Sequence, residues 1–171
     1  MTDDERVTHY IELWKQTVAV QQHFNDLEWK IRQLALTAMT FTLGAAGLAA
    51  KDRRAIQLFG WKIQLSSTLL LFGLLLWLSF YFVDQVWYHR LLVGAVKHGE
   101  AWEEAIRAYL PEAGLTAAIS AASPYKVSIW TGPGRRRKLA EIHSRSKLRF
   151  FYAIGAAGLI VAALALQVSA G

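Results

Sequence analysis

The sequence predicts an all-α integral membrane protein with three transmembrane helices, and three observations support this. The 171 residues are 54% apolar and only 19% charged, whereas soluble domains are about 25% charged. All 32 charged residues lie outside three long gaps in the sequence. Each gap, built as a helix, is about long enough to cross the roughly 30 Å hydrocarbon core of a bilayer. We therefore expect one small membrane unit.

The three charge-free gaps set the boundaries of the spans. Residues 33–50, 63–83 and 150–171 make gaps of 18, 21 and 22 residues, or about 27, 31 and 33 Å of helix. The second is apolar on every face, unlike an amphipathic helix of a soluble protein. The first contains Gln33 and three threonines, so a buried core helix is its alternative. A lipid-exposed span is favoured because threonine hydroxyls can bond to carbonyls of their own helix.

The distribution of cations predicts the orientation. With three spans, residues 1–32 and 84–149 lie on one side, and residues 51–62 and the C-terminus lie on the other. Lys and Arg number 15 on the first side and 4 on the second, so the positive-inside rule places the N-terminus in the cytoplasm. We expect a multi-pass protein of a bacterial inner membrane with an external C-terminus. The four cations in the short external loop 51–62 run against this bias.

Residues 1–32 are expected to form a cytoplasmic amphipathic helix that continues into the first span. Thr2 and Glu5 fit a capping box, and neither glycine nor proline interrupts residues 2–43. Apolar or small residues recur three and four positions apart from Tyr10 to Ala38, which is the spacing of a heptad seam. We expect this seam to pack on the chain's own 84–149 segment. The alternative is a stalk that oligomerises.

Residues 84–149 are predicted to form a helical cytoplasmic module. Residues 87–110 have helical spacing, and this helix can be continuous with the second span until Pro111 stops it. A short apolar, alanine-rich piece follows at 113–122. Residues 125–130 alternate like a strand, but the sequence shows no obvious second strand to pair with it.

A basic juxtamembrane segment precedes the third span. It holds seven cations and one acid within 15 residues, a pattern typical of contact with anionic lipid headgroups. The alternative is a phosphate-bearing ligand such as a nucleotide, since arginine binds phosphate well. We expect no nucleic-acid partner. The anionic-lipid contacts are assigned to Arg135, Arg136, Arg137, Lys138, Arg145, Lys147 and Arg149.

The sequence offers little catalytic chemistry. The absence of cysteine excludes disulfides, thiolate metal sites and a cysteine nucleophile. No histidine pair or phosphate-loop motif is present, so we expect no catalytic, metal or cofactor residues. A membrane enzyme that uses His89 and His98 with nearby glutamates stays as an alternative. We instead expect His98 to lie in an aromatic stripe, and Glu103 and Glu104 to form a solvated helix face.

Two stripes of small residues suggest association of helices. Small residues let helix backbones approach closely in a membrane, and packing within one three-helix bundle would explain both stripes. Our first hypothesis for function is a non-enzymatic, self-associating scaffold or membrane effector whose cytoplasmic module senses a protein or ligand. Copies of the first span around an axis would make an oligomeric channel, which is the alternative. The stripes are Gln33, Thr37, Thr40, Gly44 and Gly47 in the first span, and Gly155, Gly158 and Ala162 in the third.

Overall fold

The computed structural model describes residues 2–52, 54–58, 60–131, 136–142 and 144–169. The chain divides into two compact units. The membrane unit comprises residues 28–87 and 149–171, and the helical module comprises residues 1–27 and 88–148. We use these two names below and describe each unit by itself.

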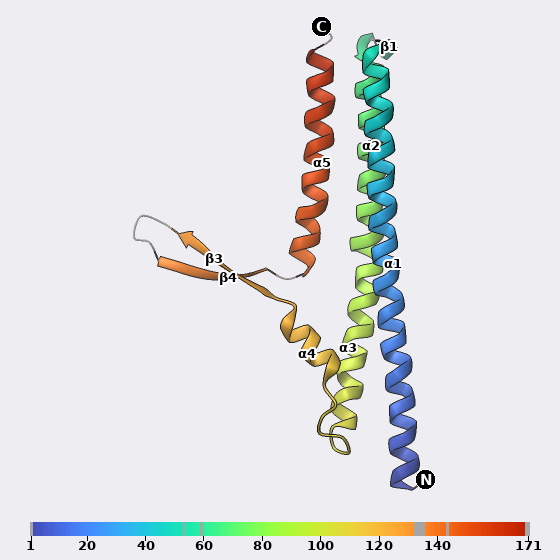
Figure 1. Cartoon of the computed structure of the whole chain (residues 1–171), viewed down its shortest axis with the longest axis vertical. Helices are drawn as coiled ribbons and strands as arrows, with labels where there is room; N and C mark the ends of the chain where they lie inside the picture. The colour runs from blue at the N-terminus through green and yellow to red at the C-terminus, as the bar shows by residue number, and fades with distance from the viewer. Residues whose placement is uncertain (1, 53, 59, 132–135, 143, 170–171) are drawn as a thin grey trace. The chain divides into compact units, whose positions relative to one another are not determined.

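The longest helix is α1 (Asp3–Lys51), with 49 residues (Figure 1). Its start is the predicted capping box: the Thr2 amide donates to Glu5 Oε2 at 2.8 Å, and the Glu5 amide donates to Thr2 Oγ1 at 3.3 Å. The capping box thereby satisfies two of the backbone donors at the start of the helix. The prediction of one unbroken helix that runs into the first span is confirmed.

A second continuous helical stretch contains α2 (Leu65–Tyr81), the π-helical segment η1 (Phe82–Tyr88) and α3 (His89–Ile106). The third long helix is α5 (Ser144–Val168). Each of the three stretches is long and apolar enough to cross a membrane. These lengths and compositions define a multi-pass membrane protein. The second span begins at Leu65 rather than at residue 63, because Ile63 and Gln64 belong to a strand.

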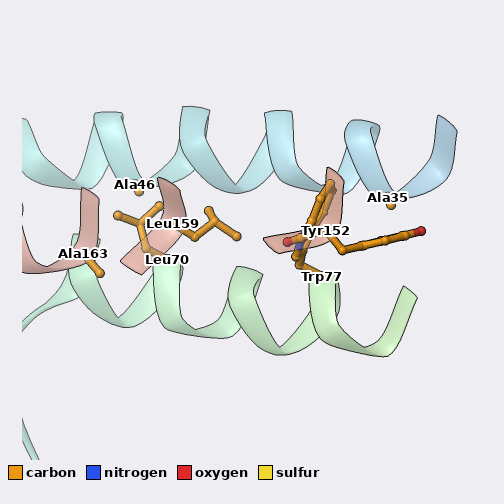
Figure 2. Packing of buried hydrophobic residues seen from close by; sticks show 7 residues of the cluster. All are labelled: Ala35, Ala46, Leu70, Trp77, Tyr152, Leu159 and Ala163. Carbon is orange, nitrogen blue, oxygen red and sulfur yellow. The ribbon is translucent and has the colours of Figure 1, made fainter. Parts of the chain in front are cut away.

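The core of the membrane unit lies between α1, α2 and α5, as Figure 2 shows. Trp77 of α2 packs against Tyr152 of α5 with ring centroids 5.1 Å apart, and its Nε1 donates to the Tyr152 carbonyl at 2.8 Å. This satisfies the one polar atom that the buried indole carries. The buried apolar residues are Ala35, Ala46, Leu70, Trp77, Tyr152, Leu159 and Ala163.

The helical module joins the first part of α1 to α3 and to the short helix α4 (Leu115–Ala122). Tyr10 lies 5.7 Å from Trp102 and 6.2 Å from Tyr109, between ring centroids. The Gln21 side chain donates to the Ala95 carbonyl at 3.1 Å. The heptad seam in this part of α1 therefore packs on the chain's own module, which agrees with the favoured interpretation.

Two antiparallel hairpins depart from the all-α prediction. Strands β1 (Ala55–Leu58) and β2 (Trp61–Gln64) pair within the segment expected to be a loop. Strand β3 (Tyr125–Thr131) pairs with β4 (Arg136–Ile142), so the alternating segment does have a partner. The partner was missed because its cations hide the alternation of a strand and were interpreted as a lipid-facing run.

Candidate functional site

A buried polar cluster joins the three helices of the membrane unit at one end. Asp84 of η1 is 0% exposed. Arg32 of α1 donates to it through Nε at 2.9 Å and through Nη2 at 3.1 Å. The Tyr152 hydroxyl of α5 donates to Asp84 Oδ2 at 3.0 Å. Arg32 also donates to Glu28 one turn earlier in α1. A bidentate arginine–carboxylate pair fixes orientation as well as charge, so this cluster sets the register of three helices.

The backbone around Asp84 is unusual. Residues 82–88 are π-helical, and the Phe82 amide is shared between the Leu78 and Ser79 carbonyls. π-helical segments are rare in proteins, and those that do occur are frequently found at functional sites. The next residue, Gln85, is 4% exposed, and neither atom of its amide has a hydrogen-bond partner among the described residues. An unsatisfied buried amide is costly, which marks this turn of the helix as specialised.

In the sequence, Arg32 and Asp84 are the charged residues that border the first and second predicted spans. Their pairing had a detectable signal: opposite charges border two spans on the same predicted side, so they lie at the same depth. Tyr152 carried no comparable signal, because an aromatic residue near a span end is normally assigned to the interface.

The predicted stripe of α1 faces away from the core of its unit. Its five residues are exposed, and nothing lies within 4 Å of a side-chain atom added at Gly44 or Gly47. The opposite face, with Ala35 and Ala46, is the packed one. The Thr37 and Thr40 hydroxyls each donate to a carbonyl four residues earlier at 2.9 Å. Packing inside this chain therefore does not explain the stripe.

The stripe of α5 is divided. Gly155 lies directly against the Trp77 indole, where an added methyl group would overlap the ring. Ala162 is partly buried against the core. Gly158 is exposed and has open space around it. Gly155 and Ala162 thus serve packing within the bundle, and Gly158 does not.

The helical module has its own buried carboxylate, Glu103, which is 1% exposed. It accepts hydrogen bonds from the Thr116 amide at 2.7 Å, the Ala117 amide at 3.2 Å and Trp14 Nε1 at 3.1 Å. The amides belong to the first turn of α4, where orphan N–H groups favour an anion. Glu103 therefore holds α1, α3 and α4 together.

The pKa of Glu103 records this environment. Burial acts to raise the pKa, but the hydrogen bonds from Thr116, Trp14 and Ala117 act in the opposite direction. The net result is a pKa below the ordinary value of 4.5. The prediction that Glu103 lies on a solvated helix face is wrong, because its carboxylate serves as the N-terminal cap of α4. Glu104 is exposed and pairs with Arg107 at 2.9 Å.

The histidine and glutamate residues of the enzyme alternative do not gather in one place. His98 accepts from Trp102 Nε1 at 2.7 Å, with the rings edge to face, so it lies in the predicted aromatic stripe. Glu103 and Glu104 have the separate partners given above. Among the described residues, no group of three or more metal-binding side chains is close enough to hold an ion.

The basic segment is described only in part. Arg135 lies outside the described residues, as do the side chains of Arg136, Arg137, Lys138 and Arg145. The backbone of residues 136–138 is in β4, and residue 145 is in α5. Lys147 Nζ donates to the Ser123 carbonyl at 3.2 Å, and Arg149 is exposed.

The fold defines the class of this protein, a multi-pass membrane protein with a helical module. Comparison with family models, with curated proteins and with solved structures finds no match for the chain.

Proposed function

We propose that this protein is a non-enzymatic membrane scaffold or effector that associates with copies of itself through α1. The observation that carries the proposal is the exposed stripe at Gln33, Thr37, Thr40, Gly44 and Gly47. Small side chains on one face of a membrane helix permit close approach of a second helix. The chain's own α2 and α5 use the other face, so the stripe is available to another copy.

The helical module supplies the second half of the proposal. Its aromatic contacts and its buried Glu103 give the module a defined packing. Such packing is required of a module that recognises a cytoplasmic protein or ligand. Juxtamembrane cations, including Arg149, contact anionic lipids beside it. His98, Glu103 and Glu104 each have separate partners, which favours a binding role for the module over catalysis.

Cysteine crosslinking in membranes tests the α1 interface, because the chain has no native cysteine. Thr40→Cys lies in the stripe, and Ala45→Cys is exposed on a different face of the same helix. Mild oxidation should crosslink Thr40→Cys into dimers and leave Ala45→Cys monomeric. Equal crosslinking of the two variants, or none in either, contradicts self-association through this stripe.

The orientation of the chain in the membrane is tested with the same protein, which has no native cysteine. Single cysteines at Gln57 in β1 and at Ser123 after α4 are probed in intact cells with an impermeant thiol reagent. The cation distribution predicts labelling at Gln57 and protection at Ser123. The reverse pattern overturns the proposed cytoplasmic N-terminus and leaves the self-association proposal intact.

A channel is the second candidate function, favoured by the two threonine hydroxyls on the exposed stripe. Copies of α1 around an axis would bring these oxygens and the Gly44 and Gly47 backbone to a common centre. Thr40→Leu should abolish ion flux in liposomes if such a pore exists. Wild-type flux equal to that of protein-free liposomes, or wild-type flux in Thr40→Leu, removes the channel and leaves the scaffold.

A further inference from the structure

A groove runs between α2 and α5 at the end of the membrane unit that carries β1 and β2. Its volume is about 340 Å³, within the size range of ligand sites. The apolar side chains along it include Ile63, Leu71, Ile160 and Leu164, of which Leu164 is 61% exposed. The groove exists because two small residues, Ser67 and Ala163, face one another where larger ones would fill the space.

The polar groups inside the groove already have partners within the chain. Ser67 Oγ donates to the Ala163 carbonyl at 2.9 Å. Gln167 accepts from the Gln64 amide at 3.0 Å and donates to the Lys62 carbonyl at 3.1 Å. The groove is therefore suited to an apolar occupant. Since its walls are two membrane-length helices, that occupant is a hydrocarbon chain of the bilayer.

A lysine side chain, Lys62, lies at this apolar groove. Lys62 belongs to the groove lining and is exposed. The backbone of Arg54 is close to the start of α2, because its carbonyl accepts from the Leu65 amide at 2.9 Å, and its side chain pairs with Asp52 at 3.5 Å. These residues come from the loop whose four cations run against the positive-inside bias. The apolar groove is complementary to an acyl chain, and the cationic Lys62 is complementary to an anionic headgroup.

We propose that the groove between α2 and α5 binds one acyl chain of a phospholipid whose anionic headgroup is held by Lys62. This site gives Lys62, one of the four cations of residues 51–62, a role as a headgroup ligand. It is independent of self-association and of the module.

The test measures lipid retained by the full-length protein in nanodiscs of phosphatidylglycerol and phosphatidylcholine in equal amounts. After release from the nanodiscs, native mass spectrometry counts bound lipid per chain. The wild type should retain one lipid, with phosphatidylglycerol preferred. Ala163→Leu fills the groove from inside, and Leu164→Trp covers it from an exposed position that leaves the core untouched. Both should lower retention at least fivefold.

Matched controls separate the groove from general effects. Ala157→Leu adds the same bulk at an exposed position of α5 outside the groove. Lys62→Gln should keep a bound lipid but lose the preference for phosphatidylglycerol, whereas Lys97→Gln should change nothing. Wild-type retention by both Ala163→Leu and Leu164→Trp overturns the groove as an acyl-chain site. An unchanged preference in Lys62→Gln overturns its role as the headgroup ligand.

Discussion

Asp84 in the membrane unit and Glu103 in the helical module are both buried carboxylates, but different groups compensate their negative charges. Each is almost fully buried, at 0% and 1% exposure, and each accepts three hydrogen bonds from two other helices. Asp84 is balanced by the guanidinium of Arg32. Glu103 is balanced by neutral donors, chiefly the N-terminal amides of α4.

The difference follows from the surroundings of the two carboxylates. Asp84 lies within a continuous helical stretch, and the donors it accepts from are side chains of α1 and α5, with the opposite charge supplied by Arg32. In the module the chain turns sharply before Leu115, which presents free amides and their partial positive charge. A buried acid at a span boundary therefore depends on a partner side chain, and one beside a short helix depends on the backbone.

The largest expected effect comes from removing the charge of the membrane cluster. Asp84→Asn leaves the half-buried Arg32 without its bidentate partner and should lower the free energy of unfolding by about 3 kcal/mol. Denaturant unfolding of the protein in micelles measures this loss. Asp26→Asn is the control, because Asp26 is exposed on α1. Equal stability of the two variants would show that the cluster does not join the helices.

A smaller loss is expected from Glu103→Gln in the module. The amide keeps the volume but cannot accept all three hydrogen bonds, so the cost should be about 2 kcal/mol. Hydrogen exchange of the α4 amides should accelerate most. Glu104→Gln, one residue away and exposed, should change stability by less than about 0.5 kcal/mol. Unchanged α4 protection in Glu103→Gln contradicts the capping role.

The pH dependence sharpens the same comparison. The pKa of Glu103 is lowered in the folded protein, so its stabilising contribution is complete above the ordinary value of 4.5. As the pH falls below that value and through the lowered pKa, the contribution is lost. The stability difference between wild type and Glu103→Gln should therefore be constant at neutral pH and shrink below about pH 4.5. A difference that shrinks already near pH 6 is the contrary result.

The smallest effect separates two glycines of α5 that are three residues apart. Gly155→Ala forces the new methyl group against the Trp77 indole, and overpacking of about 2 kcal/mol is partly offset by the helix propensity of alanine. The expected net loss is about 1 kcal/mol. Gly158→Ala meets open space and should be neutral or slightly stabilising. Thermal unfolding of the two variants side by side decides between them, and identical shifts are evidence against the described packing.

The sequence was sufficient for the features that depend on local pattern. Charge-free gaps located three membrane-length helices, and the spacing of Thr2 and Glu5 located the start of α1. The aromatic stripe containing His98 and Trp102 was also predictable from its helical spacing. Each of these signals lies within a few turns of one element, where periodicity and capping rules apply directly.

The remaining features depend on pairs that are distant in the sequence. Arg32 and Asp84 are 52 residues apart, and Trp14 and Glu103 are 89 residues apart. Periodicity does not identify the partner of a helix face, so the pairing of Trp14 with Glu103 does not follow from one sequence. For Arg32 and Asp84 the sequence indicates a common depth but not the contact itself. Strand β4 was missed for a related reason, since its cations obscured the alternation that would have matched β3.

The oligomeric mass of the full-length protein in nanodiscs tests the central claim, self-association through α1, most directly. The wild type should contain more than one chain per particle. The double variant Gly44→Leu, Gly47→Leu blocks the stripe where the chain itself has open space, so it should fold and yield single chains, while Ala45→Leu should keep the wild-type mass. A monomeric wild type, or a double variant with the wild-type mass, would contradict self-association through this stripe.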